Sequence, residues 1–411
     1  MKLSLLLSLA LCSLASAQSE KVYWAAGDSI FRSDLSGANL ETVLSGLAEP
    51  SGVAVERCDG HLYWTDLTSR QVMRSELDGS SVQAIFTSQS PWTPTNITVD
   101  PIRRHLYLTE GVTSNDLGRI ARIDYAGSNH VELVSLGFDR PVDIKLDLGV
   151  GRMYWSEFEG LRIQSANLDG TQVVTVAQLS GSAAALALDL IGRKVYWADA
   201  GEFGPTLIQR ANLDGSNLET LPITFNDNPS LSIDEVGQKL YFTDQTSSSD
   251  LQRSNLDGSN VQTLVTTSGF TTGMDILFDD AGVSFCPATA NSTGSPTKLC
   301  TGGTSSLAAN ELVLVAQPAP NQPGLFFYGP GQTQLPFGNG FLCVTGPIQR
   351  QGVTQAQDNV FSWHLDTTNP PTAAGLITAG SQWSFQLWFR DPAAGGAAYN
   401  LSDARTVQFL P

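Results

Sequence analysis

The chain has few basic residues, few cysteines and, beyond its N-terminus, no long apolar run. Its 411 residues contain 23 Lys and Arg against 40 Asp and Glu, a formal net charge of −17. This acidic balance argues against nucleic acid and anionic membranes as partners, and it permits cations or basic partners. No apolar run after the N-terminus approaches the ~18 residues of a transmembrane helix, so we expect no membrane span.

Motifs of the common enzyme classes are also missing. The sequence contains no G-x-S-x-G elbow, no H-E-x-x-H pair and no P-loop, which argues against the hydrolases, metalloproteases and nucleotide-binding enzymes that use them. It contains no C-x-x-C either, so a zinc site has no support. Residues 20–285 show no sustained helical periodicity, which points to an all-β protein.

The N-terminus has the pattern of a secretory signal. Lys2 precedes the apolar stretch LSLLLSLALCSL, and Ala15, Ser16 and Ala17 fit a small-residue cleavage site. We therefore expect residues 1–17 to be a signal peptide and the mature chain to begin near Gln18. Loss of Lys2 would leave 22 basic against 40 acidic residues, a net charge of −18. The product should be exported, and either soluble or held on a surface by contacts.

Four cysteines would remain in the mature chain, and an exported protein can oxidise them. They are Cys58, Cys286, Cys300 and Cys343. Four cysteines allow three pairings, which sequence cannot distinguish. We favour Cys286 with Cys300, because this pair flanks a short stretch rich in Ser, Thr and Pro.

Three motifs repeat along residues 20–285. A tyrosine-led fragment such as HLYWTD recurs every 40 to 47 residues, beginning at Tyr23, Tyr63, Tyr107, Tyr154, Tyr196 and Tyr241. Each copy is followed by a turn motif such as NLDG, which ends at Gly37, Gly79, Gly127, Gly170, Gly215 and Gly258. Each later copy is preceded by an apolar or alternating run that ends at Glu56, Asp100, Asp147, Asp189 or Asp234, and a last such run ends at Asp279.

This arrangement predicts a six-bladed β-propeller. Short β-type runs separated by Asp-Gly or Ser-Gly turns, four to a period of about 40–45 residues, are the pattern of propeller blades. The first tyrosine has no acid-ended run before it, and the last run, Gly273 to Asp279, has no tyrosine after it. We therefore expect the C-terminal run to supply the innermost strand of the first blade, which closes the ring and removes two exposed sheet edges.

With these motifs, residues 20–285 resemble the YWTD six-bladed propeller of the low-density lipoprotein receptor class B repeats. The departures are YWAA at Tyr23, YLTE at Tyr107, YFTD at Tyr241 and DYAG in place of LDG. In that family the propeller commonly docks protein ligands. The receptors also carry cysteine-rich modules and a membrane span that this chain lacks, so the resemblance implies the propeller and its tendency to bind proteins, not endocytosis.

Two sets of charged residues recur with the repeat. A base stands two residues before each tyrosine and five after each preceding acid, which predicts a charge pair across the hairpin, as for Glu56 and His61. His61 is then architecture, since a general base would be unique to one blade. Arginines recur in the third strand, and we expect them to pair with the acids of the tyrosine motif. These are Arg32, Arg74, Arg122, Arg210 and Arg253, with Asp66, Glu110, Asp199 and Asp244 as partners.

Function should lie where the copies differ. The loops after each tyrosine motif, and those that enter each inner strand, open on the same face of a propeller. They carry aromatic residues with acids interleaved: Trp92, Phe138, Asp139, Phe158, Glu159, Glu202, Phe203, Phe225, Asp227 and Phe270. A large exposed apolar patch usually marks an interaction site. The sequence therefore predicts a non-catalytic surface that binds a protein or peptide with basic and apolar groups.

A divalent-metal-dependent esterase or lactonase is the alternative. Other six-bladed propellers hold a cation at the channel mouth, and Asn96, Asp143 and Asp275 could together offer oxygen ligands to Ca²⁺. The competing interpretation is that these residues line a water-filled channel or bond the backbone. We expect no cofactor other than this possible Ca²⁺.

A second domain follows the repeats. The propeller is expected at residues 18–286, and the Ser-, Thr-, Gly- and Pro-rich residues 287–308 indicate a linker. Residues 309–411 lack lysine but contain short β-type runs such as GLFFYG and WSFQLWF, which predict a small antiparallel β-sandwich with Trp383 in its core. The stretches PFGNGFLCV, WSFQLWFRDP and YNLSDA resemble a terminal module of secreted bacterial proteins of planctomycete type.

Overall fold

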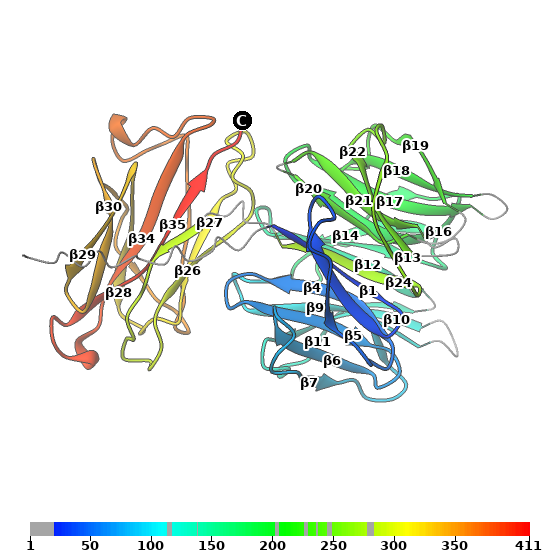
Figure 1. Cartoon of the computed structure of the whole chain (residues 1–411), viewed down its shortest axis with the longest axis horizontal. Coiled ribbons are helices and arrows are strands. Elements are labelled where there is room, and N and C mark those ends of the chain that lie inside the picture. Colours follow the sequence, from blue (N-terminus) through cyan, green and yellow to red (C-terminus); the bar gives the residue numbers. More distant parts are fainter. Residues whose placement is uncertain are drawn as a thin grey trace, which may run out of the picture.

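The computed structural model describes residues 20–112, 117–137, 139–201, 205–225, 229–235, 237–244, 249–277 and 283–411. It divides into two all-β parts that lie side by side (Figure 1). The strands of the first part are β1 (Lys21–Ala26), β2 (Ser29–Asp34), β3 (Glu41–Leu44), β4 (Pro50–Glu56), β5 (His61–Asp66), β6 (Gln71–Glu76), β7 (Gln83–Thr87), β8 (Thr93–Asp100), β9 (His105–Val112), β10 (Leu117–Asp124), β11 (Val131–Gly137), β12 (Pro141–Asp147), β13 (Arg152–Glu157), β14 (Arg162–Asn167), β15 (Val174–Gln178), β16 (Gly181–Asp189), β17 (Lys194–Gly201), β18 (Thr206–Asn212), β19 (Glu219–Phe225), β20 (Leu231–Asp234), β21 (Lys239–Asp244), β22 (Ser249–Asn255), β23 (Gln262–Thr267) and β24 (Thr271–Leu277).

These strands form six four-stranded antiparallel sheets, the blades of a propeller. Five blades use consecutive strands, from β4–β7 to β20–β23. The first blade has the order β24-β1-β2-β3, with Met274 opposite Trp24 and Asp275 opposite Tyr23. The interlocked closure predicted from the sequence is therefore confirmed, and the innermost strand of the first blade comes from the last repeat.

The aromatic residues of the repeat pack between blades. Trp64 of the second blade is fully buried against Tyr23 and Ile30 of the first, and Trp155 of the fourth blade lies against Tyr107 of the third. Burial of a side chain of this size contributes roughly 1.5–3 kcal/mol or more relative to exposure. Each repeat thus stabilises the ring only in contact with its neighbour.

The glycine of the turn motif is required by both conformation and space. Gly79 has φ +84°, in the left-handed region that favours glycine. A Cβ at this position would overlap the carbonyl oxygen of Val43 in the preceding blade. The turn can therefore approach the neighbouring blade only because it lacks a side chain.

The second part is a β-sandwich. Its elements are β25 (Val283–Cys286), β26 (Lys298–Gly302), β27 (Val313–Gln317), β28 (Pro323–Gly329), β29 (Gly331–Phe337), β30 (Gly340–Thr345), β31 (Gln349–Arg350), β32 (Thr354–Gln355), β33 (Phe361–His364), the 3₁₀ turns η1 (Ala373–Gly375) and η2 (Pro392–Ala394), β34 (Gln382–Arg390) and β35 (Tyr399–Gln408). A sheet of order β25-β35-β34-β28-β31, with β32 also on β28, faces a sheet of order β26-β27-β33. Leu314, Phe326 and Phe385 fill the core between them.

Trp383 lies in this core, as the sequence predicts, and packs edge-on against Tyr328 with ring centroids 5.4 Å apart. The predicted linker, however, is wrong. Residues within 287–308 include β26, which pairs with β27 and buries Leu299 and Cys300, while β25 pairs with the last strand, β35. Ser-, Thr- and Gly-rich composition favours loops, but here pairing with distant strands decides the structure.

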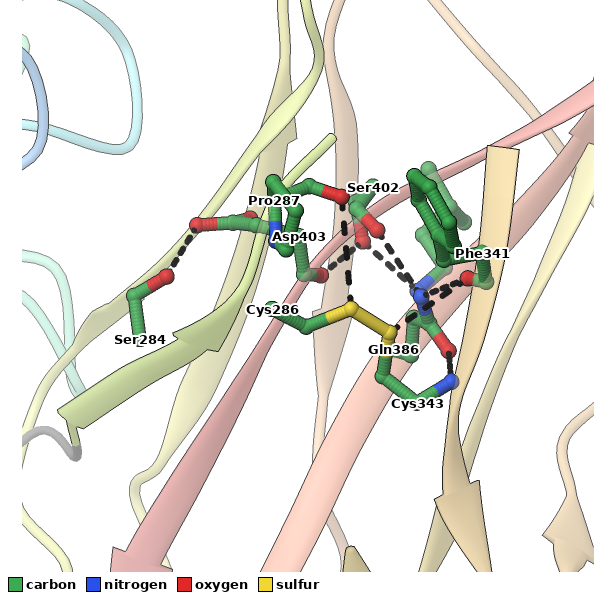
Figure 2. The surroundings of a disulfide bond; sticks show 9 residues. Ser284, Cys286, Pro287, Phe341, Cys343, Gln386, Ser402 and Asp403 are labelled. Carbon is green, nitrogen blue, oxygen red and sulfur yellow. Dashed lines mark hydrogen bonds between the residues drawn. A yellow bond between two sulfur atoms is a disulfide. The ribbon is translucent and has the colours of Figure 1, made fainter. Parts of the chain in front are cut away.

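The predicted disulfide is also wrong. Cys286 is bonded to Cys343, with Cα atoms 6.2 Å apart, and the bond ties β25 to β30. Figure 2 shows the amide of Gln386 beside it: its oxygen accepts from the Cys343 N–H at 3.0 Å, and its nitrogen donates to the Phe341 carbonyl at 2.8 Å. The favoured pairing assumed a short loop, whereas the partner comes from the facing hairpin.

Candidate functional site

The repeated tyrosines and arginines join each blade to the next. The Tyr241 hydroxyl donates to the carbonyl oxygen of Leu35 in the first blade at 2.8 Å, and Arg253 Nη1 donates to the same oxygen at 3.0 Å. Tyr196 and Arg210 share the Leu256 carbonyl in the same way. These arginines were expected to form ion pairs within their own blade, with the motif acids as partners. Ion pairs within the blade do form, between Arg32 and Glu41 and between Arg210 and Glu219, each at 2.6 Å. The predicted partner is wrong, because these acids lie on the fourth strand.

The motif acids have other partners. Asp66 accepts from the Ser69 N–H and hydroxyl, both at 2.8 Å, and Asp199 accepts from the Ser180 hydroxyl at 3.0 Å. Glu110 does pair with an arginine, but with Arg119 rather than Arg122. The side chain of Asp244 lies outside the described residues. Asp66 and Asp199 thus fix loop conformations, while Glu110 bonds Arg119 on the third strand of its blade.

His61 has the architectural role expected of it, with a different partner. Glu56 lies opposite His61 in the β4–β5 ladder, as predicted. The Glu56 carboxylate, however, accepts from the backbone N–H groups of Cys58 and Asp59, while His61 Nε2 lies 3.7 Å from Glu76 on the next strand. Burial, followed by the charge of Arg74, lowers the His61 pKa, so the ring is neutral at pH 7.

The turn between β4 and β5, and the equivalent turn of each other blade, lie on one face of the propeller, here called the base. The C-terminal module covers this face. Strands β26 and β27 lie on the side of the module that faces the propeller (Figure 1). Arg193 at the base pairs with Asp147 of the propeller at 2.8 Å and with Glu311 of the C-terminal module at 3.3 Å. Gly302 and Gly303 line the base end of the central channel. Within the described residues, access to the channel from this side is therefore restricted.

The opposite face, here called the loop face, carries both variable loop sets. The loops meet through backbone hydrogen bonds, such as Phe158 N–H to the Arg140 carbonyl at 2.9 Å and Gly27 N–H to the Phe270 carbonyl at 3.1 Å. The sequence argument that the two sets open together is thus supported by these contacts.

Arginines cover two of the predicted aromatic residues on the loop face. The Arg119 guanidinium lies 4.1 Å from the ring centroid of Trp92, and the Arg140 guanidinium lies 4.8 Å from that of Phe158. Both distances are within the range of cation–π attraction. Both rings are half-buried, and a guanidinium covers part of each ring. Neither residue therefore presents a fully exposed apolar surface.

The two predicted acids that the structure describes are paired. Asp139 accepts from Arg162 at 2.9 Å, and Glu159 accepts from Arg140 at 3.2 Å. Sequence reasoning missed these arginines. A signal was present, since Arg140 stands next to Asp139 and Arg162 follows Glu159 closely, and mixed-sign clusters in loops usually form ion pairs.

Phe270 and Phe225 have opposite environments. Phe270 is 68% exposed and is the most exposed aromatic side chain of the described propeller. Phe225 is 4% exposed and packs edge-on against Phe242 with centroids 5.3 Å apart. The assignment of Phe225 to the surface is therefore wrong, because strand β19 continues through it and turns its ring into the core. Phe138, Glu202, Phe203 and Asp227 lie outside the described residues.

Asn96 and Asp143 line the end of the channel that opens on the loop face, whereas Asp275 lines its base end, so the structure does not bring the three proposed calcium ligands together in one pocket. Backbone N–H groups already bond their oxygens. Asp143 Oδ2 accepts from the Leu186 N–H of the next blade at 2.9 Å, and Asp275 Oδ2 accepts from the Val55 N–H at 2.9 Å. The Asn96 oxygen accepts from its neighbour's N–H at 2.7 Å. Lys145 Nζ also lies 3.2 Å from Asp143 Oδ1. Calcium binding stays a prediction, in competition with this ammonium group.

Among the described residues, one His and acid cluster has ligand atoms close enough to hold a metal ion: Glu56, Asp59 and His61, within 4.8 Å of one another. Two of its members already have partners. Glu56 accepts from backbone N–H groups, and Asp59 accepts from Arg104 at 2.7 Å. The cluster is explained by the turn that it stabilises.

Comparison with known proteins gives matches in the propeller. The family model described as low-density lipoprotein receptor repeat class B matches residues 60–101. A human low-density lipoprotein receptor-related protein 5-like protein is 35% identical over 34% of this chain and 55% of its own length. A low-density lipoprotein receptor-related protein 1 of Pyricularia oryzae is 28% identical over 43% of this chain and 67% of its own length. The chain thus spans little more than half of the first of these relatives.

Solved structures agree on the fold. A chain of a nidogen/laminin complex superposes with a TM-score of 0.55 at 23% identity, covering 63% of this chain and 99% of that one. TolB of Acinetobacter baumannii gives 0.53 at 13% identity, covering 62% and 66%. No helix among the described residues is long and apolar enough to cross a membrane. The resemblance is confirmed for the propeller, and the planctomycete-type module stays a prediction.

Proposed function

We propose that this chain, whose propeller is built from low-density lipoprotein receptor class B repeats, is an exported, non-catalytic protein-binding module that receives its ligand on the loop face. One observation carries the proposal. The C-terminal module covers the base, whereas the loop face leaves Phe270 68% exposed and also carries the half-buried rings of Trp92 and Phe158. Exposed aromatic residues are unfavourable in water and are enriched at the centres of protein interfaces.

The chemistry of this face favours an apolar anchor on the ligand. Asp139 and Glu159 are neutralised by Arg162 and Arg140, so they hold the loops in place rather than await a basic partner. The net charge of −17 still attracts basic ligands over longer range. The ligand we propose is a protein or peptide with an apolar group for Phe270 and basic residues around it.

Relatives support a binding role. The similar chain from the nidogen/laminin complex comes from a structure that contains a protein partner, and the curated relatives include proteins named as receptor-related. The hydrolase alternative lacks comparable support, since the described carboxylates at the channel mouth are bonded to backbone N–H groups and to Lys145.

Affinity capture tests the proposal. The full mature chain would be immobilised and exposed to the envelope and culture fluid of the producing organism, beside Phe270→Ala and Val353→Ala variants. Val353 is 71% exposed on the C-terminal module, so its variant removes an equally exposed apolar side chain away from the loop face. We expect a protein that the wild type and Val353→Ala retain and that Phe270→Ala loses. Equal retention by the wild type and both variants would refute the proposal.

A further inference from the structure

Two cysteines outside the Cys286–Cys343 disulfide meet at the base of the propeller. Cys58 lies in the turn between β4 and β5, and Cys300 lies in β26 of the C-terminal module. Both are buried. Glu56 and Arg57, which precede Cys58, line the base end of the channel together with Gly302 of β26. Cys58 and Cys300 are near enough that Cys300 raises the pKa of the Cys58 thiol, although they belong to different domains. With Cys286 and Cys343 already joined, each has the other as its remaining partner in the mature chain.

Neighbouring contacts hold β26 at this position. Two residues after Cys300, Gly302 lies so close to the propeller that a Cβ there would come 2.9 Å from Ile102 Cδ1. Two residues before it, Lys298 is near enough to affect the ionisation of His61. On the other side of the contact, the Cys58 N–H donates to Glu56 Oε1 at 2.8 Å. The approach of the two thiols is therefore fixed from both domains.

We propose that Cys58 and Cys300 form a second disulfide, which joins the C-terminal module covalently to the base of the propeller. The oxidant is a disulfide of the general form R–S–S–R, either a small molecule or a protein carrier. One cysteine thiolate attacks it, releasing one R–SH and leaving a mixed disulfide. The other cysteine, as its thiolate, then displaces the second R–SH. Two thiols thus lose two protons and two electrons, and the carrier is reduced to two thiols.

Burial determines when this bond forms. Contact with Cys300 and desolvation raise the pKa of the Cys58 thiol well above its usual value, so the docked, reduced protein contains little of the thiolate that exchange requires. The buried site also excludes a carrier. The bond therefore forms while the module docks onto the propeller, and afterwards the same burial protects it from external reductants.

The disulfide would fix the base as a permanent domain interface. Strand β26 would be anchored beside Ile102, and Gly302 and Gly303 would stay at the base end of the channel. This inference is independent of what binds on the loop face.

Refolding in a glutathione redox buffer tests it. The denatured, reduced mature chain would be refolded in oxidised and reduced glutathione, alkylated with iodoacetamide in denaturant and digested without reductant for mass spectrometry. We expect one peptide pair linked through Cys58 and Cys300, another linked through Cys286 and Cys343, and no alkylated cysteine. Alkylated Cys58 and Cys300 in protein that has refolded, or Cys58 linked to a different cysteine, would overturn the proposal.

A second measurement does not depend on refolding. Amide hydrogen exchange of the oxidised mature chain would be followed by mass spectrometry, and we expect slow exchange in β26, which the cross-link holds on the propeller. A Cys300→Ser variant is the matched control. It should show Cys58 alkylated with the Cys286–Cys343 bond intact, together with faster amide exchange in β26 than the oxidised wild type. Exchange in β26 of the Cys300→Ser variant that equals that of the oxidised wild type would contradict the inferred cross-link.

Discussion

Replacing Tyr241 by Phe removes one hydroxyl where the sixth blade meets the first. In the wild type, this hydroxyl donates to the Leu35 carbonyl at 2.8 Å, and Arg253 donates to the same oxygen at 3.0 Å. The Phe variant keeps the buried ring and leaves the carbonyl bonded to Arg253. No polar group loses its last partner, so the cost is that of one net hydrogen bond, about 1 kcal/mol.

The two donors should be coupled. Replacing Arg253 by Met alone leaves Tyr241 on the Leu35 carbonyl, whereas the double variant leaves that oxygen with neither donor. An unsatisfied buried acceptor costs about 1–3 kcal/mol, so the double variant should lose more stability than the two single variants together. The excess is measured by a double-mutant cycle.

Tyr63 provides a matched control. It occupies the equivalent position in the second blade and is fully buried, but within the described residues its hydroxyl makes no hydrogen bond of normal geometry. Tyr63→Phe should therefore be neutral or slightly stabilising. Calorimetry of the full chain would follow the propeller transition, in which about 1 kcal/mol corresponds to a fall in Tm of roughly 2–4 °C. A neutral Tyr241→Phe variant, or an equal loss in Tyr63→Phe, would refute the reasoning.

Three further predictions follow from buried groups. Trp383→Ala should destabilise the C-terminal module by about 3–5 kcal/mol, measured by amide exchange, and a loss confined to the immediate neighbours would count against its core role. The pKa values of His61 and His105 are lowered, mainly by burial, so the folded state binds fewer protons and stability falls as pH drops through the unfolded value of about 6.5. The Tm of the wild type should therefore fall more between pH of about 7.5 and 5.5 than that of a His61→Gln/His105→Gln variant, and parallel curves would contradict this sign. Asp143→Ala should cost about 1.5–3 kcal/mol in urea unfolding, because the Leu186 N–H loses a charged acceptor. A rise in the wild-type Tm with added Ca²⁺ would support the predicted metal site, and an unchanged Tm would count against it.

The propeller could be predicted from the sequence because the same local sequence pattern recurs in six in-phase copies. Strand runs, turn glycines and aromatic positions recur, and a missing first strand with a surplus last one determines the closure. Contacts between segments that are distant in the sequence were not predicted correctly. Besides ion pairs within their own blade, arginines of the third strand bond carbonyl oxygens of the next blade, and no spacing within one repeat contains that information. Strand β26 lies in a segment of loop-like composition but pairs with β27, and β25, which was assigned to the propeller, pairs with β35 of the C-terminal module.

The candidate site was predicted in part for the same reason. Differences between the copies indicate the loop face, where Phe270 is exposed, and ligand binding on this face stays a prediction. The assignment of Phe225 to the surface was wrong because strand β19 extends to this residue and buries its ring against Phe242. Asp139 and Glu159 were predicted to attract a basic ligand, but Arg162 and Arg140 lie close to them in the folded structure and pair with them.

Site-specific photo-crosslinking tests the central claim most directly. A benzophenone amino acid would replace Phe270 in one variant and Val353 in another, and each full-length variant would be exported by the producing organism and irradiated in place. The account predicts a cross-linked protein adduct at position 270 and none at position 353. Adducts at neither position, or only at position 353, would contradict a protein-binding loop face.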